Sequence, residues 1–193
     1  MKSLKILFIA VLCILTSGVS LAQEKFSPEF RPGISFPLNK IAGNKVNTGY
    51  GFEITIAYEV LQDVGVYAGW GWNKFDADNA FLTDRTDIEE TGYTAGIQFK
   101  HRIKNSALSY LIRGGAVYNH LELEDNAGEP IADSDHGLGW QAEAGLTLEI
   151  GNNWDLRPTI RYRSLPGTLE VFNGQMSVDL RYISLGMGLA KKF

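Results

Sequence analysis

Cysteine is almost absent from this sequence, which holds a single thiol in 193 residues. That residue, Cys13, lies in the apolar run 6–15, and Leu12 precedes it where a lipoprotein cleavage site has a small residue. A lipid anchor at this position is therefore not expected. Residues 23–193 contain no cysteine, which excludes disulfide bonds and thiol catalysis from that part of the chain.

Long hydrophobic runs are also absent after residue 22. None of the later apolar stretches reaches the roughly 20 residues that a membrane-spanning helix requires. Hydropathy alone would therefore indicate a soluble protein. A membrane-spanning strand escapes such an analysis, because only every second residue of the strand faces lipid.

The first 22 residues have the three parts of a secretory signal peptide. Lys2 and Lys5 supply positive charge, residues 6–15 form the apolar segment, and residues 20–22 (Ser-Leu-Ala) form a small-x-small cleavage site. We predict a cleaved signal peptide over 1–22 and one domain over 23–193. The alternative, an N-terminal membrane anchor, is disfavoured because the apolar run is shorter than a spanning helix.

Positive charge is scarce in the predicted mature chain. Removing Lys2 and Lys5 takes away no acid and changes the formal net charge from −4 to −6. No stretch forms a basic patch, so nucleic-acid binding is not expected. We also predict no cofactor.

What the sequence does contain is a repeated two-residue alternation of apolar and polar positions. Residues 138–150 show it clearly, since Leu138, Trp140 and Leu146 alternate with Gly139, Gln141 and other small or polar residues. A period of two is typical of β-strands. The pattern predicts eight strands, over residues 26–37, 48–59, 64–75, 90–101, 107–121, 138–150, 154–164 and 176–193.

The connections between these predicted strands alternate in length. Short turns are predicted at 62–63, 104–106 and 151–153, and longer loops at 39–47, 76–89, 122–137 and 165–175. Short turns on one side and long loops on the other are typical of an up-and-down transmembrane barrel. The predicted fold class is therefore all-β, an eight-stranded antiparallel up-and-down transmembrane β-barrel.

The polar face of the predicted strands carries charges that indicate which face lies inside. An eight-stranded barrel has an interior just wide enough to be filled by side chains. In a soluble barrel, the alternative, the large apolar residues would have to fill this narrow interior. Turning the apolar face to lipid avoids the excess volume, and we predict a lumen network of paired charges formed by Arg31, Glu53, Arg113, Glu143, Arg157 and Arg161.

Aromatic residues on the apolar face fall near the two ends of the predicted strands. Amphipathic rings gather where a bilayer meets water, and barrels carry two such girdles. We predict one girdle near the outer rim, including Trp70, Trp72, Trp140 and Tyr162. We predict a second girdle near the inner rim, including Tyr58, Phe99 and Trp154.

The signal peptide, the eight alternating strands, the rhythm of loop lengths and the final Phe193 together resemble the small bacterial outer-membrane β-barrel family, of the OmpA-barrel and OmpX type. The resemblance covers the whole predicted mature chain and implies the cell outer membrane as its location. In that family a terminal aromatic residue is part of the signal read by the assembly machinery, which implies this role for Phe193. The implied partners are outer-membrane lipids or lipopolysaccharide and the assembly machinery, and the implied state is a monomer.

Three functions fit the predicted barrel. The first is a structural or surface-interaction role, with the charge network as a static filling of the lumen. The second is a narrow porin, in which the charge pairs exchange partners. The third, which we do not expect, is a lipid-modifying enzyme using Ser134, Asp135 and His136.

The predicted outer loops also carry many acidic residues. Carboxylate oxygens favour hard cations such as Ca²⁺ or Mg²⁺. The spacing matches no EF-hand loop, however, and we expect solvated loop charges rather than a cation site. These residues are Asp76, Asp78, Asp84, Asp87, Glu122, Glu124, Asp125, Asp133 and Asp135.

Overall fold

The computed structural model describes residues 25–41, 44–78, 85–125, 130–171 and 174–193. The described part of the chain is built from strands, and it holds no helix long and apolar enough to cross a membrane. The strands are β1 (Phe26–Pro37), β2 (Val46–Leu61), β3 (Val64–Asp78), β4 (Arg85–Arg102), β5 (Leu108–Glu124), β6 (Pro130–Asp133), β7 (Gly137–Gly151), β8 (Trp154–Val171) and β9 (Gly174–Lys191).

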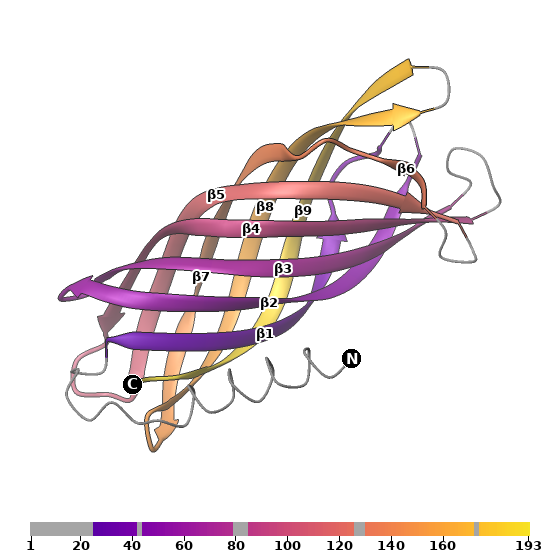
Figure 1. The fold of residues 1–193 in the computed structure, drawn as a ribbon. Coiled ribbons are helices and arrows are strands. Elements are labelled where there is room, and N and C mark those ends of the chain that lie inside the picture. Colours follow the sequence, from indigo (N-terminus) through magenta and orange to yellow (C-terminus); the bar gives the residue numbers. More distant parts are fainter. Residues whose placement is uncertain (1–24, 42–43, 79–84, 126–129, 172–173) are drawn as a thin grey trace, which may run out of the picture.

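Eight of these strands form a closed antiparallel barrel (Figure 1). Each strand pairs with its neighbour along the chain, β4 continues the sheet to β5, and β1 pairs with β9. The short strand β6 lies on the end of β5, and β5 pairs next with β7. The predicted eight-stranded up-and-down barrel is confirmed, with β6 as an addition that the alternation did not indicate.

Tight turns join the strands at one end of the barrel, which we call the short-turn end. Asp63 and Lys104 have positive φ angles of 66° and 50° in two of these turns. Gly151, Asn152 and Asn153 all have positive φ in the third. Glycine and asparagine tolerate this backbone region better than other residues, which explains the sequence of that turn. The opposite end is the long-loop end.

The strands extend further toward the long-loop end than the alternation predicted. The predicted loop 76–89 is wrong over most of its described length, because β3 continues to Asp78 and β4 begins at Arg85. The predicted loop 165–175 is also wrong, since β8 and β9 pair from Trp154↔Lys191 up to Val171↔Gly174. This β8–β9 hairpin extends beyond the neighbouring strands in Figure 1.

The chain region before residue 25 lies outside the described residues. The signal peptide over 1–22 therefore stays a prediction. Phe193 forms two backbone hydrogen bonds with Phe26, in which the Phe193 N–H donates to the Phe26 carbonyl at 2.9 Å and the Phe26 N–H donates in return at 3.3 Å. This pairing joins the end of the chain to β1, and the role of Phe193 in assembly stays a prediction.

Candidate functional site

The interior of the barrel holds five arginines and five acids, all of them buried among the described residues. Fully buried charges are very costly unless they are paired and hydrogen-bonded. The equal numbers allow every charge to be compensated inside the lumen. The ten residues are Arg31, Arg113, Arg157, Arg161, Arg163, Glu29, Glu53, Glu90, Glu143 and Asp155.

Glu29 is the centre of the network nearest the short-turn end. Its carboxylate lies 3.0 Å from the Nε of Arg31, 2.8 Å from Arg113 and 2.9 Å from Arg157. Arg157 also contacts Asp155 at 2.9 Å. One carboxylate therefore joins β1, β5 and β8 across the lumen.

Glu143 on β7 forms the next junction. It accepts a hydrogen bond from Arg31 on β1 and lies 3.4 Å from Arg113 on β5. Arg113 also donates to the Gln98 side chain at 3.2 Å, and its guanidinium lies 5.2 Å from the centre of the Tyr67 ring. The arrangement holds the middle of the lumen with contacts between opposite walls of the barrel.

Glu53 on β2 is shared by three guanidinium groups. Arg31 lies 3.3 Å from it, Arg163 donates to it at 2.9 Å, and Arg161 donates to the same carboxylate. Thr94 adds a further hydrogen bond at 3.2 Å. This is the most crowded junction of the network.

Glu90 ends the network on the side of the long-loop end. It accepts hydrogen bonds from Asn73 at 2.6 Å and from the Tyr182 hydroxyl at 2.9 Å, and it lies 3.2 Å from Arg163. Arg163 also donates to Gln141 at 2.8 Å. These polar side chains come from β3, β4, β7, β8 and β9, so they join opposite walls of the lumen.

The structure brings the six sequence-predicted lumen residues into this network. Arg31 and Glu53 are cross-strand neighbours, as the sequence indicated. Arg113 and Glu143 are neighbours as well, and so are Glu143 and Arg161. Arg161, however, contacts Glu53 across the lumen, although Glu143 is its neighbour in the sheet. Strand neighbours alone therefore did not reveal this partner.

Four charged members of the network were missed by sequence reasoning. Glu90 is the first residue of the predicted strand 90–101, where the alternation is weakest, and Asp155 follows a turn. Glu29 lies between two prolines, Pro28 and Pro32, which obscure the pattern. Arg163 shares parity with Arg157 and Arg161, and that parity was the available signal for including it.

Two glycines on β9 make room for the network. A Cβ atom at Gly186 would lie 2.9 Å from Cδ of Arg31, and one at Gly188 would collide with the Glu29 carboxylate. The long charged side chains therefore need glycine on the facing strand. This explains why the polar face of β9 is rich in glycine.

Above the charge network, toward the long-loop end, the interior becomes apolar. Phe75 packs edge-on against Tyr182, with ring centroids 5.2 Å apart, and so joins the two parts of the interior. The apolar cluster consists of Ile41, Val46, Phe75, Ala77, Ile88, Val117, Leu121, Leu123, Leu165, Val178, Leu180 and Tyr182. We call this set the apolar plug.

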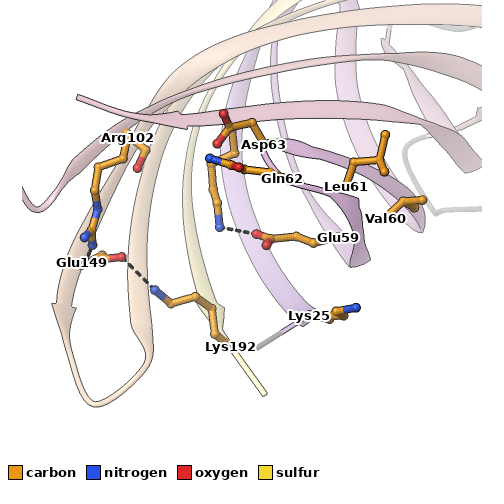
Figure 2. Close-up of a pocket in the computed structure, with 11 residues that line it drawn as sticks. Lys25, Glu59, Val60, Leu61, Gln62, Asp63, Arg102, Glu149 and Lys192 are labelled. Atoms are coloured by element: carbon orange, nitrogen blue, oxygen red, sulfur yellow. Dashed lines mark hydrogen bonds and ion pairs between the residues drawn. The ribbon is translucent and has the colours of Figure 1, made fainter. Parts of the chain in front are cut away.

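The short-turn end contains an open cavity of about 680 Å³ (Figure 2). Lys100 lies 2.6 Å from Glu59, and Lys192 lies 3.0 Å from Glu149, which also pairs with Arg102. The cavity is therefore a polar vestibule whose charges are largely paired. It lies next to the junction of Asp155 and Arg157, because Lys192 also approaches Asp155 at 3.5 Å.

The outer face of the barrel carries the predicted aromatic residues. Trp140 packs on Tyr162 with a centroid separation of 5.1 Å, and Trp72 packs edge-on against Tyr50 at 5.8 Å. Trp70 lies 5.8 Å from Phe52.

At the short-turn end, Tyr58 packs on Phe26 at 4.9 Å and Phe99 on Tyr110 at 5.9 Å. Trp154 lies beneath the ammonium of Lys191 at 5.1 Å. The predicted residues thus lie in two groups, one toward each end of the barrel.

An acidic cluster lies on the outer face just above Trp72. Lys74 lies 3.1 Å from Asp87, 3.1 Å from Glu89 and 2.8 Å from Glu124. The Trp72 indole donates to Glu89 at 3.0 Å. Carboxylate oxygens of Glu89, Glu122 and Glu124 lie within 4.8 Å of one another, and the Lys74 ammonium contacts two of these three acids, so the cluster stays acidic. Of the other predicted crown residues, Asp84 lies outside the described residues.

The residues weighed for catalysis do not form a nucleophile and base pair. Ser134 is buried, and its hydroxyl accepts a hydrogen bond from the Leu121 N–H at 2.9 Å. His136 instead stacks on Tyr118 at 4.8 Å and on His120 at 5.1 Å. A nucleophile requires a base within hydrogen-bond reach, and the Ser134 hydroxyl is hydrogen-bonded to the backbone of β5 instead.

Comparison with known proteins decides the family. Residues 9–190 match the outer membrane protein beta-barrel domain. The chain belongs to this family. Among curated proteins none matches the chain. Family membership places the protein in the bacterial outer membrane, where barrels have short periplasmic turns and longer outer loops.

Several solved structures share the fold. Neisserial surface protein A is 15% identical, with a TM-score of 0.59, and the match covers 89% of this chain and 98% of that protein. Outer membrane protein W of E. coli is 13% identical, with a TM-score of 0.56 and coverage of 89% and 100%. Ail of Yersinia pestis, solved in complex with the heparin analogue sucrose octasulfate, is 19% identical, with a TM-score of 0.50 and coverage of 86% and 99%. At these identities the likeness concerns the fold alone.

Proposed function

We propose that this outer-membrane barrel is closed and has a structural and surface-interaction role. The observation that carries the proposal is the continuous filling of the interior, by the charge network in the middle and by the apolar plug toward the long-loop end. The strands that continue beyond the outer aromatic residues would then present the protein to the cell exterior.

The two parts of the filling oppose the passage of ions for different reasons. An ion in the middle section would have to separate buried charge pairs, each of which is costly to leave unpaired. An ion in the plug would lose its water, since hydrophobic constrictions close pores by dewetting. Both barriers act in series along the barrel.

The charge of the long-loop end indicates the kind of partner. Asp87, Glu89, Glu122 and Glu124 lie on the outer face there, with Lys74 between three of them. The related fold of Ail holds a polyanion in its solved complex. An acidic surface repels polyanions, so we propose a cationic partner for this chain.

Further parts of the proposal concern the membrane and assembly. We propose that outer-membrane lipids or lipopolysaccharide surround the apolar outer face, that the assembly machinery recognises Phe193, and that the barrel is a monomer. We propose no catalytic role for Ser134, because its hydroxyl accepts a hydrogen bond from the backbone of β5.

A narrow porin is the second candidate, and two observations favour it. The vestibule at the short-turn end already gives solutes an entrance of about 680 Å³. Arg161 pairs with Glu53 but is the strand neighbour of Glu143, so two carboxylates are available to it. An exchange of partner by Arg161 would rearrange the middle of the lumen.

Planar-bilayer conductance of the protein purified from outer membranes distinguishes the two candidates. We expect no reproducible discrete channels from the wild type, because the apolar plug closes the lumen even when the charge pairs rearrange. The Glu143→Gln variant should stay silent and be less stable, since Arg31 and Arg113 lose a partner. Glu149→Gln, in the vestibule, is the matched control and should change neither property strongly.

The opposite outcome is equally well defined. Discrete wild-type channels whose conductance changes in Glu143→Gln but not in Glu149→Gln would reject the closed barrel. The narrow porin would then be the function, with Glu143 in its conducting path.

A further inference from the structure

Arg161 is the lumen arginine with the fewest acidic partners among the described residues. Arg31, Arg113, Arg157 and Arg163 each contact two or more carboxylates, whereas Arg161 contacts Glu53 alone. The side chain of Arg161 is buried, and its Nε has no hydrogen-bond acceptor. A buried guanidinium donor without an acceptor is costly.

The single acidic partner of Arg161 is shared with other arginines. Glu53 also serves Arg31 and Arg163, so one carboxylate faces three guanidinium groups. Glu29 and Glu143 compensate Arg31 from the other side, and Glu90 compensates Arg163. The excess positive charge is therefore centred on Arg161.

A small, partly open cavity adjoins this side chain. Its volume is about 10 Å³, which is close to the space that one water molecule requires. The polar residues that line it are Arg31, Arg161, Ser35, Ser184, Asn73 and Thr159. No carboxylate belongs to the described lining, although five acids are buried elsewhere in the lumen.

The hydrogen bonds around the cavity already use the serine hydroxyls and the Asn73 amide as donors. The Asn73 carbonyl oxygen accepts from Ser35 at 3.2 Å, and the Thr159 hydroxyl accepts from Arg31 at 3.4 Å. The hydroxyls of Ser35 and Ser184 lie 2.8 Å apart, and Ser184 donates this hydrogen bond because Ser35 donates to Asn73. A small molecule or ion in this cavity would lie beside the guanidinium groups of Arg31 and Arg161, and the Nε of Arg161 has no acceptor.

We propose that the cavity beside Arg161 binds a small monatomic anion, with chloride as the physiological candidate. The anion would supply the acceptor that Arg161 lacks and compensate the charge excess around Glu53. The size of the cavity admits a single small ion and excludes polyatomic anions such as gluconate or sulfate. The site does not depend on whether the barrel conducts.

Bromide is a direct probe, because its anomalous scattering separates it from water. Crystals of the full protein soaked in bromide should show an anomalous peak within hydrogen-bond distance of Arg161, between β1, β8 and β9. A water molecule at full occupancy, with no bromide signal at this position, would overturn the proposal.

A solution measurement uses variants that fill or discharge the cavity. Ser184→Thr adds one methyl group to a space of one water molecule, and Arg161→Met removes the charge. The wild type should have a higher thermal midpoint in potassium chloride than in potassium gluconate at equal ionic strength, because a ligand stabilises the state that binds it. This difference should disappear in both variants.

Ser109→Thr is the matched control, since Ser109 is also buried but lines the vestibule instead. It should keep the chloride effect of the wild type. A chloride effect of unchanged size in Ser184→Thr would overturn the proposal, even if Arg161→Met failed to fold. An effect that disappears equally in Ser109→Thr would also overturn it, because it would not be specific to the cavity.

Discussion

The membrane-spanning section of the barrel and the section toward the long-loop end use the same strands with opposite chemistry. On β3, Trp70 and Trp72 point outward in the first section, and Lys74 continues the same face in the second. The inward face changes in the reverse sense, from Asn73 in the charge network to Phe75 in the apolar plug. The same reversal occurs on β9, where Leu185 is exposed on the outward face and Leu180 is buried inside.

On β3, β4 and β5 this inversion occurs without a register shift, whereas β2 has an irregularity between Val46 and Gly49. The pairing of β3 with β4 runs from Val64↔Phe99 to Asp78↔Arg85 without a register shift, and the pairing of β4 with β5 is equally continuous. Inward residues therefore stay inward along the whole strand. We infer that the medium outside changes from lipid to water near Trp72, whose indole donates to Glu89.

The comparison shows that two different forces fill one interior. Between the aromatic groups, lipid covers the outside, and the inside is held by charge pairs that cross the lumen. Beyond Trp72 the outside is wet, so apolar burial inside the barrel becomes favourable as in a soluble protein. We infer a membrane barrel whose strands continue into water with an apolar interior.

The largest expected effect is the difference in unfolding free energy between two leucine substitutions on β9. Leu180→Ala should destabilise the protein by about 2–5 kcal/mol, because it leaves a cavity in the apolar plug. Leu185→Ala, on the lipid face at 53% exposure, should cost less than about 1 kcal/mol. Urea unfolding in lipid vesicles measures both, and equal costs would show that the plug is not a packed core.

A lysine scan of the outer face should locate the boundary between the two sections. Ile97→Lys places a charge in lipid midway between the aromatic groups and should cost about 2–4 kcal/mol. Asp76→Lys makes the matched change on the outer face beyond Trp72 and should be close to neutral. The same unfolding assay compares them, and a large cost at residue 76 would mean that lipid covers this section too.

The inversion also explains which parts of the fold were predictable from the sequence. Alternation indicated the strands wherever one face was oily and the other polar, as in β7. On β4 and β5 the apolar residues switch from the outward to the inward face beyond Tyr93 and Tyr118. The period-two pattern is broken there, and it predicts a loop although the strand continues. The predicted strand ends at 75, 90, 121 and 164 lie close to this change of phase.

The inward direction of the charged side chains in the candidate site was also predictable, but their contacts were not. Parity placed Arg31, Glu53 and Arg113 inside, because a strand allows only two directions for a side chain. Parity does not give contacts across the lumen, so the pairing of Arg161 with Glu53 required the three-dimensional structure. The apolar plug was not predictable from the alternation. Leu165 lies in the predicted loop 165–175, and Leu180 lies on the face of the predicted strand 176–193 that is small or polar over 182–190.

The smallest expected effect is the loss of stability at low pH that Glu89, on the outer face beyond Trp72, should cause. Burial raises the pKa of Glu89, but hydrogen bonds from Trp72 and Lys74 outweigh it and hold the pKa below the ordinary 4.5. A carboxyl whose pKa is lowered by folding stabilises the folded state above its unfolded pKa, and this contribution is lost as the pH falls through the folded value. The wild type should therefore lose about 1 kcal/mol or less relative to Glu89→Gln when the pH falls from 6 to below 4.5, because the cluster borders water. Urea unfolding of both proteins across this range measures the difference. A stability difference that does not change with pH would mean that Lys74 and Trp72 do not hold this carboxylate, and that the acidic cluster is solvated as separate charges.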